Sequence, residues 1–300
     1  MSDTLITAQE LRDKNPSGLP ELTQNLSKSS FWYYTRLSTA DTVLNQASFR
    51  VSNLKDMNDL DEVQLHADNQ DNLFALCFCN SNTEKIPMWY LYSGIAGNGA
   101  ALGFTPLRMS MFIRSIRTVK GVIGKEPVAD LAIGSDVELQ YGWVYYRKES
   151  KPEEVLYQNK WYVIDDSQLF EKDNYFLKAY PWEYEREFRI IFINQTNAKY
   201  DALFVDIPEE ILKNIKVKLA PELSKDKFLQ IKNLSCIGKD SRFEPQYSKL
   251  SIKMNLFHRN RKSLPDYLKT EFSKDAPDIT PSELCELIHS AGKCIHDNTI

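Results

Sequence analysis

The sequence predicts an α+β protein whose main domain is a single unit built on a mixed or antiparallel sheet. Segments with strand character outnumber segments with helical periodicity along the 300 residues. They also follow one another without the regular strand–helix alternation of a doubly wound parallel sheet. Aromatic residues make up 12% of the chain, a share that suits a well-packed sheet or an aromatic-lined pocket.

Composition and charge exclude several classes of protein. Hydrophobic residues at 42% and charged residues at 26% are typical of a soluble globular protein. The net charge of −4 gives no global basic field for nucleic acid, although the basic run at 258–262 leaves a local patch open. No run of 18 apolar residues exists and the first residues are polar, so we expect neither a membrane span nor a secretory signal. With five cysteines, an odd number, we expect reduced thiols in a cytoplasmic protein.

The first half of the chain mixes strand signals with short helices. Residues 1–30 are punctuated by Pro and Gly, and we expect a leader with a short helix near 7–13. The aromatic run at 31–38 and the alternating run at 48–52 indicate strands, and the apolar run at 72–79 indicates a buried central strand. The same rules predict helices at 39–45, with Ser38 or Thr39 as the cap, at 86–93 and at 107–118, and a strand at 100–104.

The second half contains the strongest strand signal, the apolar run at 187–193. Other strands are expected at 141–147, 161–165, 202–207, 217–220 and 232–237, and helices at 166–180 and 208–212. Two amphipathic patterns, at 264–272 and 281–294, predict a helical end to the chain. The chain therefore divides into a leader (1–30), an α+β domain (31–262) and a helical extension (263–300) that is available to a protein partner.

Acidic residues gather directly before the strongest strand. Glu183, Glu185 and Glu187 share one face of an extended segment, because side chains alternate along a strand. Like charges at this spacing repel, so these carboxylates either face water, paired with Arg186 and Arg189, or line a site. In a site, the Glu187 carboxylate can orient a sugar hydroxyl or stabilise an oxocarbenium cation.

Two further segments have open interpretations. Arg36 shares a strand face with Tyr34, and a buried Arg needs either a glutamate or an anionic ligand beside it. Asn58, Asp59 and Glu62 either close a loop on its own backbone or form a site loop, and their spacing departs from a calcium-binding loop, so no metal is predicted. The glycine-rich stretch 94–99 lacks the order of a dinucleotide fingerprint and is interpreted as a turn with glycines at positive φ.

Taken in order, these motifs resemble those of a large bacterial family of unknown function. The resemblance covers about residues 31–195 and departs from the family pattern at Cys79, where Ser is usual. The motifs stand here as Tyr34-Thr35-Arg36-Leu37, Ser52 with Asn58-Asp59 and Glu62, Cys77-Phe78-Cys79, Met88-Trp89-Tyr90-Leu91-Tyr92, Gly99 through Gly103-Phe104, and Trp182-Glu183-Tyr184-Glu185-Arg186-Glu187-Phe188-Arg189.

That family is similar, more remotely, to the ADP-ribosyltransferase fold, and above all to the toxins that modify DNA. The similarity implies that NAD is the substrate and that an acceptor macromolecule, protein or nucleic acid, receives its ADP-ribose. It implies that Glu187 is the catalytic glutamate and that Glu185 positions or activates the acceptor. It assigns NAD binding to Arg36, Tyr34, Ser52, Tyr90 and Tyr92, and a substrate or structural loop to Asn58, Asp59, Glu62 and Arg189.

We therefore expect an NAD-dependent ADP-ribosyltransferase-like effector in a toxin or antiphage-defence setting. One alternative is a non-enzymatic module that senses a ligand or a partner protein, with residues 263–300 as the docking element. A second alternative is a metal-dependent nuclease that uses Asp59, Asp61, Glu185 and Glu187.

Overall fold

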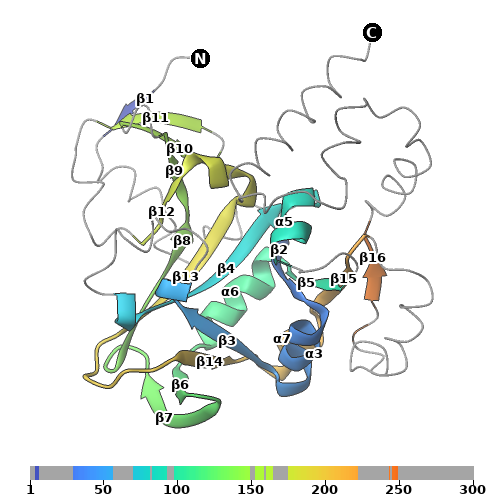
Figure 1. Ribbon diagram of the computed structural model, residues 1–300, viewed down its shortest axis with the longest axis vertical. Helices are drawn as coiled ribbons and strands as arrows, with labels where there is room; N and C mark the ends of the chain where they lie inside the picture. Colours follow the sequence, from blue (N-terminus) through green and yellow to red (C-terminus); the bar gives the residue numbers. More distant parts are fainter. Residues whose placement is uncertain are drawn as a thin grey trace, which may run out of the picture.

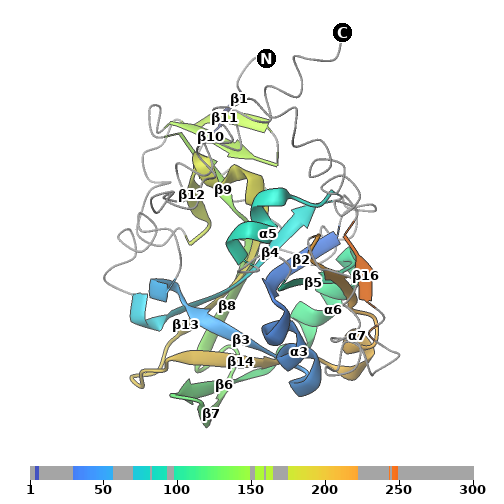
Figure 2. The ribbon, with the colours of Figure 1, turned by 45° about the vertical axis from the view of Figure 1, so that its right-hand side comes forward.

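The computed structural model describes residues 4–6, 30–56, 70–81, 83–92, 98–148, 153–158, 160–164, 175–221, 243 and 245–248. Within them the chain is an α+β protein with a mostly antiparallel, open sheet and few helices, as the sequence predicts. The strands divide between an 11-stranded and a 5-stranded sheet, a division that the sequence patterns do not anticipate. Figures 1 and 2 place the smaller sheet at one end of the molecule and the hairpin of β6 (Thr118–Ile123) and β7 (Glu126–Ala132) at the other.

The centre of the large sheet is β4 (Leu73–Ser81), which is buried along almost its whole length. The antiparallel strand β13 (Glu187–Asn194) pairs along one side of it. On the other side, β2 (Ser30–Arg36) and β3 (Ser48–Asn53) each pair with a different end. A strand covered on both faces carries apolar residues at nearly every position, which explains the apolar run that predicted β4.

The remaining strands extend this centre. Beyond β2 lie β5 (Gly99–Phe104), β15 (Lys216–Leu219) and β16 (Pro245–Tyr247), and beyond β3 lie β14 (Ala202–Asp206), β6 and β7. On the far side of β13 lies β8 (Val137–Trp143). The smaller sheet has the order β1 (Thr4–Ile6), β11 (Lys160–Ile164), β10 (Glu154–Tyr157), β9 (Tyr145–Arg147) and β12 (Leu177–Ala179).

Short helices cover the large sheet. They are α3 (Leu37–Gln46), α5 (Ile86–Tyr92), α6 (Pro106–Ser115) and α7 (Glu209–Leu212), with 3-10 turns η1 (Leu54–Asp56), η2 (Gln70–Asn72) and η4 (Tyr180–Glu185). The start of α6 follows a common rule, because the Thr105 hydroxyl accepts a hydrogen bond from the Arg108 N–H and Pro106 occupies the first turn.

Alternation along β2 separates two apolar clusters. Phe31 points into the main core, where its ring centroid lies 5.1 Å from that of Phe188 and where Phe112 of α6 also packs. Trp32 points to the opposite face, where it clusters with Met88 and Trp89 of α5. Helices α5 and α6 therefore cover opposite faces of the sheet.

Three predicted elements are wrong in detail. The helix expected at 166–180 is absent from 175–180, where β12 and the start of η4 stand instead, because pairing with β9 overrides local helix preference. Helix α3 begins at Leu37, and Arg36 occupies its cap position without a side-chain cap bond. The strand expected at 141–147 is interrupted at Val144, where the chain passes from the large sheet to the small one.

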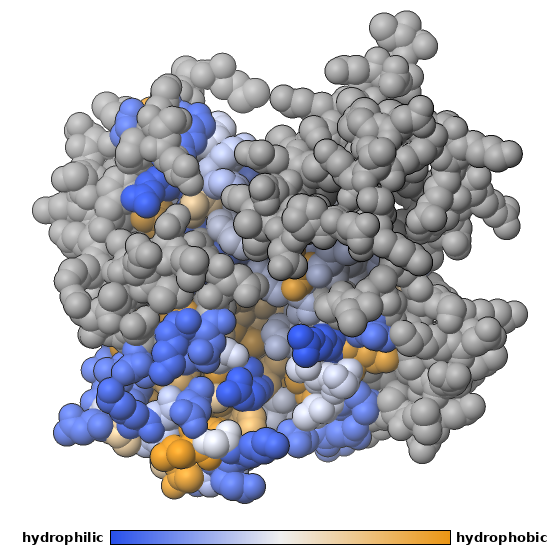
Figure 3. Space-filling model, in the orientation of Figure 1, coloured by the Kyte–Doolittle hydropathy of each residue, from blue (hydrophilic) through white to orange (hydrophobic). Residues whose placement is uncertain are grey.

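Other differences concern elements that were missed or that lie elsewhere. The β6–β7 hairpin and β10 were not predicted, and Thr4–Ile6 of the expected leader pairs in parallel with β11. In Figure 3 hydrophobic colour near the bottom of the view lies over this hairpin, where Ile123 and Val128 are about half exposed. The expected elements at 7–13, 232–237, 264–272 and 281–294, and residues 94–97 of the glycine-rich stretch, lie outside the described residues. None of the described helices is both long and apolar enough to span a membrane.

Candidate functional site

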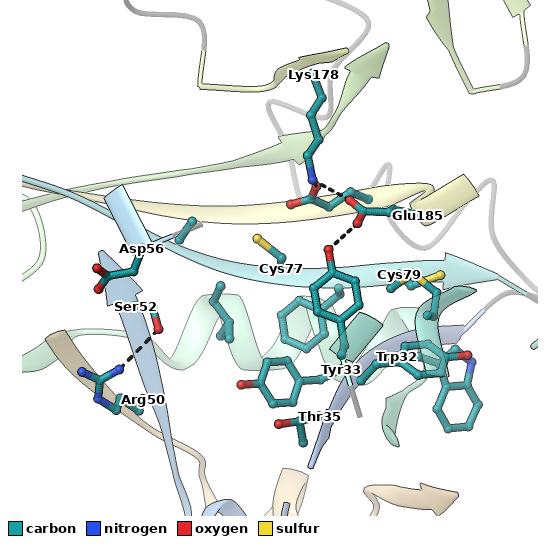
Figure 4. Close-up of a pocket in the computed structure, with 17 residues that line it drawn as sticks. Trp32, Tyr33, Thr35, Arg50, Ser52, Asp56, Cys77, Cys79, Lys178 and Glu185 are labelled. Atoms are coloured by element: carbon teal, nitrogen blue, oxygen red, sulfur yellow. Dashed lines mark hydrogen bonds and ion pairs between the residues drawn. The ribbon is translucent and has the colours of Figure 1, made fainter. Parts of the chain in front are cut away.

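A pocket of about 260 Å³ lies on the face of the large sheet that α5 covers. Strands β2, β3 and β4 form most of its wall, and α5 contributes Met88 and Tyr92. Lys178 of β12, Glu185 of η4 and Glu187 of β13 close one end of it. Figure 4 shows Lys178 and Glu185 at this end, and Arg50, Ser52 and Asp56 gathered at the other.

Side-chain alternation explains why distant segments meet at this pocket. In the register of the sheet, Cys79 of β4 lies opposite Glu187 on one side and opposite Trp32 on the other. Ser52 of β3 lies opposite Ala75, four residues from Cys79 along the same strand and therefore on the same face. Directly opposed residues point to the same face, so one face of the central strands carries the polar and aromatic site residues and the other carries the main core.

The backbone before Glu187 does not have the extended conformation that the sequence predicts. Residues 180–185 form the 3-10 turn η4, and Arg186 follows in the left-handed region with φ of 43°. The Arg186 carbonyl accepts a hydrogen bond from the Asn80 N–H at 3.0 Å, and its side chain is exposed. This turn buries Glu185 beside Glu187 and leaves Glu183 partly exposed, so the expectation that all three share one face is wrong.

A buried ion cluster occupies the acidic end. The Lys178 Nζ lies 2.6 Å from Glu185 Oε2 and 3.2 Å from Glu187 Oε2. Arg189 donates to Glu187 through Nε at 2.5 Å and through Nη2 at 3.0 Å. All four side chains are at least 92% buried, so these carboxylates do not form a solvated strand end. Buried charges need such pairing, and two anions here meet two cations.

Neutral groups fix the same cluster from other elements. The Tyr92 hydroxyl of α5 donates to Glu185 Oε1. The Glu187 N–H donates to the Tyr146 hydroxyl at 2.7 Å, and Arg189 Nη1 donates to the Tyr175 carbonyl at 2.8 Å. The geometry of the carboxylates is thus determined by α5, both sheets and η4 together.

The two glutamates have opposite electrostatic environments. Burial opposes the ionisation of Glu187, but the charges of Arg189 and Lys178 outweigh it and hold the pKa of Glu187 well below its usual range. Burial raises the pKa of Glu185, and Lys178 opposes that effect only in part. Burial alone would lower the pKa of Lys178, but Glu185 and Glu187 raise it well above its usual value. These charges therefore favour the ionised form of Glu187, whereas Glu185 is the carboxylate closer to taking up a proton.

The Tyr92 hydroxyl and the two cysteine thiols of the pocket stay protonated. Burial, reinforced by Glu185, raises the pKa of the Tyr92 hydroxyl well above its usual value. Burial, again with Glu185, raises the pKa of the Cys79 thiol to about 12, and burial also raises the pKa of Cys77. The two thiols are consequently poor nucleophiles, because reactivity belongs to the thiolate.

The opposite end of the pocket is more open and carries Arg50. This side chain is exposed, and its Nη1 donates to the Ser52 hydroxyl at 3.3 Å. Within the described part of the chain no carboxylate forms an ion pair with Arg50. Its guanidinium can therefore accept an anionic group of a ligand, such as a phosphate.

Five of the residues assigned to the site from the sequence line this pocket: Tyr34, Ser52, Tyr92, Glu185 and Glu187. Arg189 lies directly behind Glu187 and pairs with it. Arg36 does not line the pocket, because it is exposed at the end of β2, where α3 begins. Tyr90 is 44% exposed on α5 and is also outside the lining, and Asn58, Asp59 and Glu62 lie outside the described residues.

Sequence reasoning left most of the lining residues unassigned, among them Lys178, Arg50 and Trp32. Lys178 falls in a segment that was predicted to be helical. The strand rule, by which Lys178 points to the opposite face from Leu177 and Ala179, was therefore not applied to it. Arg50 was within reach of the same alternation rule, because it shares a strand face with Ser52. Trp32 carries no signal that distinguishes it from the other aromatic residues of β2.

Fold and site together define an α+β protein with a buried carboxylate–cation cluster in a pocket on its sheet. Among the described residues no group of three or more His, Cys, Asp or Glu side chains is arranged to hold a metal ion. Comparisons with protein-family models, with curated proteins and with solved structures found no match to this chain.

Proposed function

We propose that this pocket binds the reacting end of NAD and that the protein is an ADP-ribosyltransferase-like enzyme acting in a toxin or antiphage-defence setting. The observation that carries the proposal is the pair of buried carboxylates, Glu185 and Glu187, at one end of an aromatic-lined pocket. The ordered motifs described above support the same class by resemblance.

The chemistry of nicotinamide transfer fits this pair. Breaking the bond between the ribose C1′ and the nicotinamide nitrogen leaves positive charge on the ribose, and the bond electrons leave with nicotinamide. A fixed anion beside that carbon stabilises the transition state, and Arg189 and Lys178 keep Glu187 in the anionic form. An acceptor hydroxyl or amine then bonds to C1′, and Glu185 takes its proton as general base.

The rest of the pocket suits the other parts of the substrate. Trp32, Tyr34 and Tyr92 give aromatic surface for the nicotinamide ring. Arg50 and Ser52 lie at the open end, where they can bind a phosphate. A volume of about 260 Å³ is below that of pockets that enclose a drug-sized ligand, so it suits one end of the dinucleotide. In this proposal Arg50 takes the anion-binding role that the family resemblance gave to Arg36.

A second candidate is a non-enzymatic module that binds a small ligand. The observation that favours it is the internal balance of the cluster, in which Glu187 already accepts hydrogen bonds from Arg189 and Lys178. Structural ion clusters show the same pairing and perturb pKa values without doing chemistry. The nuclease alternative depends on Asp59 and Asp61, which lie outside the described residues.

The test is NAD turnover by the full chain and by its Glu187→Gln variant. Each protein is incubated with labelled NAD and a cell lysate that contains protein, RNA and DNA. We expect nicotinamide release or label transfer from the unaltered protein, and loss of at least about 100-fold in the variant, because removal of one electrostatic stabiliser typically costs this much. Glu126→Gln, on exposed β7, is the matched control and retains activity.

The outcomes separate the two candidates. NAD binding without turnover would favour the binding module. If a folded protein neither binds nor turns over NAD, the proposed function is overturned. Circular dichroism of the variant shows whether a loss of turnover reflects chemistry or unfolding.

A further inference from the structure

Lys178 approaches the pocket from the smaller sheet and lies between the two carboxylates. It belongs to β12, which pairs with β9, whereas Glu187 belongs to the large sheet. We propose that Lys178 is a positioning residue that holds Glu185 and Glu187 side by side and keeps Glu185 ionised, ready to accept a proton. The catalytic part of this inference rests on the proposed function, whereas its electrostatic part concerns the pocket alone.

The ionic partners of the two glutamates are unequal. Glu187 has two cations, because Arg189 binds both of its oxygens and Lys178 binds one. Within the described residues, Lys178 is the one cation in ion-pair distance of Glu185. Removing the Lys178 charge would therefore leave Glu187 paired and Glu185 without a counter-ion.

The other groups around Glu185 cannot replace that charge. They come from four elements and are neutral or negative: Tyr92 of α5, Tyr146 of β9, Cys79 of β4 and Glu187 of β13. Two carboxylates that share a buried site without an intervening cation do not both ionise. Without Lys178, Glu185 would thus hold its own proton and could not take one from an acceptor.

Lys178 is itself held in place. Its side chain is 8% exposed, and its Nζ lies 4.8 Å from the centroid of the Trp182 ring, in a cation–π contact. A cation positioned before substrate arrives does not have to reorganise during the reaction, which is what electrostatic preorganisation requires.

The experiment measures the titration of Glu185 directly, by NMR of ¹³C-labelled glutamate carboxyl groups in the full chain. The Glu185→Gln spectrum assigns the signal. We expect Lys178→Met to raise the titration midpoint of Glu185 by about one pH unit or more, the usual effect of losing a nearby opposite charge. The acid limb of the pH profile for nicotinamide release should move upward by the same amount. Lys178→Arg, which keeps the charge, should bring both back toward the unaltered protein.

Lys218→Met is the matched control. Lys218 is also a shielded lysine, paired with Glu84 at 3.3 Å and placed 4.1 Å from the centroid of the Trp32 ring, but it does not contact the site glutamates. Its loss should lower stability and leave the Glu185 midpoint unchanged. Equal shifts in both variants would show a general structural effect and overturn the inference.

The remaining outcomes are also decisive. An unchanged Glu185 midpoint in Lys178→Met overturns the inference whether or not the protein turns over NAD. A shifted midpoint in a protein that never releases nicotinamide supports the electrostatic role and overturns the proposed function instead. If Lys178→Met does not fold, the double variant Lys178→Met/Glu185→Gln removes the unpaired charge. It should fold and match the pH profile of Glu185→Gln alone, and a further shift would contradict action through Glu185.

Discussion

Glu185 and Glu187 are two residues apart, yet the structure gives them different chemical characters. Arg189 and Lys178 fix Glu187 as an anion, whereas burial moves Glu185 toward its protonated form. When neighbouring carboxylates are separated in this way, one is suited to charge stabilisation and the other to proton transfer. The difference follows from burial and from contacts with Arg189 of β13 and Lys178 of β12, and it cannot be seen in the Glu-Arg-Glu tripeptide itself.

The raised pKa of Glu185 predicts a pH effect on stability. In the unfolded chain a glutamate titrates at about 4.3, whereas Glu185 in the folded protein has a higher pKa. Between these two pKa values the folded state binds the proton more readily than the unfolded state does. Stability should therefore rise as pH falls through this window, and fall again as pH rises. Glu185→Gln cannot take up the proton and should lack this contribution.

The measurement is urea unfolding of both proteins at a series of pH values from 5 to 8. The free energy of unfolding of the unaltered protein, minus that of Glu185→Gln, should grow as the pH is lowered. Parallel pH dependences for the two proteins would show that Glu185 has no raised pKa.

At the scale of elements, the pocket depends on the close approach of β2 to β5. Gly103 of β5 lies directly opposite Trp32, and a Cβ at Gly103 would come within 2.4 Å of the Trp32 ring. Trp32 is itself held under Lys218 and lines the pocket. Glycine is required here by space rather than by backbone conformation.

Gly103→Ala should consequently impair both stability and ligand binding. The added methyl group forces the Trp32 ring to move, and overpacking of this kind typically costs about 1–3 kcal/mol. Gly121→Ala is a matched control, because its Cβ would come within 2.4 Å of the Tyr200 ring, outside the pocket lining. Thermal unfolding should show a loss in both variants, and NAD titration should show weaker binding only in Gly103→Ala. Equal binding by both would mean that the position of Trp32 does not matter.

At the scale of the whole molecule, the pocket collects side chains from segments between Trp32 and Glu187, spread over most of the described chain. The two sheets meet there, with the glutamates and Lys178 at one end and Arg50 at the other. This arrangement places a cationic group at the end of the pocket opposite Glu185 and Glu187, where the proposed function would place a dinucleotide phosphate.

Arg50→Ala should therefore weaken NAD binding, by roughly tenfold or more, since a hydrogen bond to a charged group contributes about 1.5–3 kcal/mol. Arg36→Ala is the matched control, because Arg36 is exposed and outside the lining. Calorimetric titration with NAD and with the phosphate-free nicotinamide riboside tests the assignment. The Arg50→Ala loss should be confined to NAD, and a loss in Arg36→Ala instead would return the anion-binding role to that residue.

Local patterns determined much of this protein in advance. The α+β class, the buried strand β4, the strand β13 and the positions of α5 and α6 follow from apolar runs and periodicity, which depend only on neighbours in the chain. Glu185 and Glu187 could also be singled out from the sequence, because a cluster of charges before an apolar strand is a local feature.

Tertiary structure alone decided which of these residues form the site. Strand neighbours are set by contacts between distant segments, so no local pattern could bring Lys178 between the glutamates or take Arg36 out of the pocket. The division into two sheets at Val144 and the charge states of Glu185 and Glu187 are non-local in the same way. The sequence by itself determined the fold class and most of the central elements of the large sheet, because these depend on adjacent residues. The fold decided the partners of each buried charge, because burial and pairing exist only once the strands have assembled.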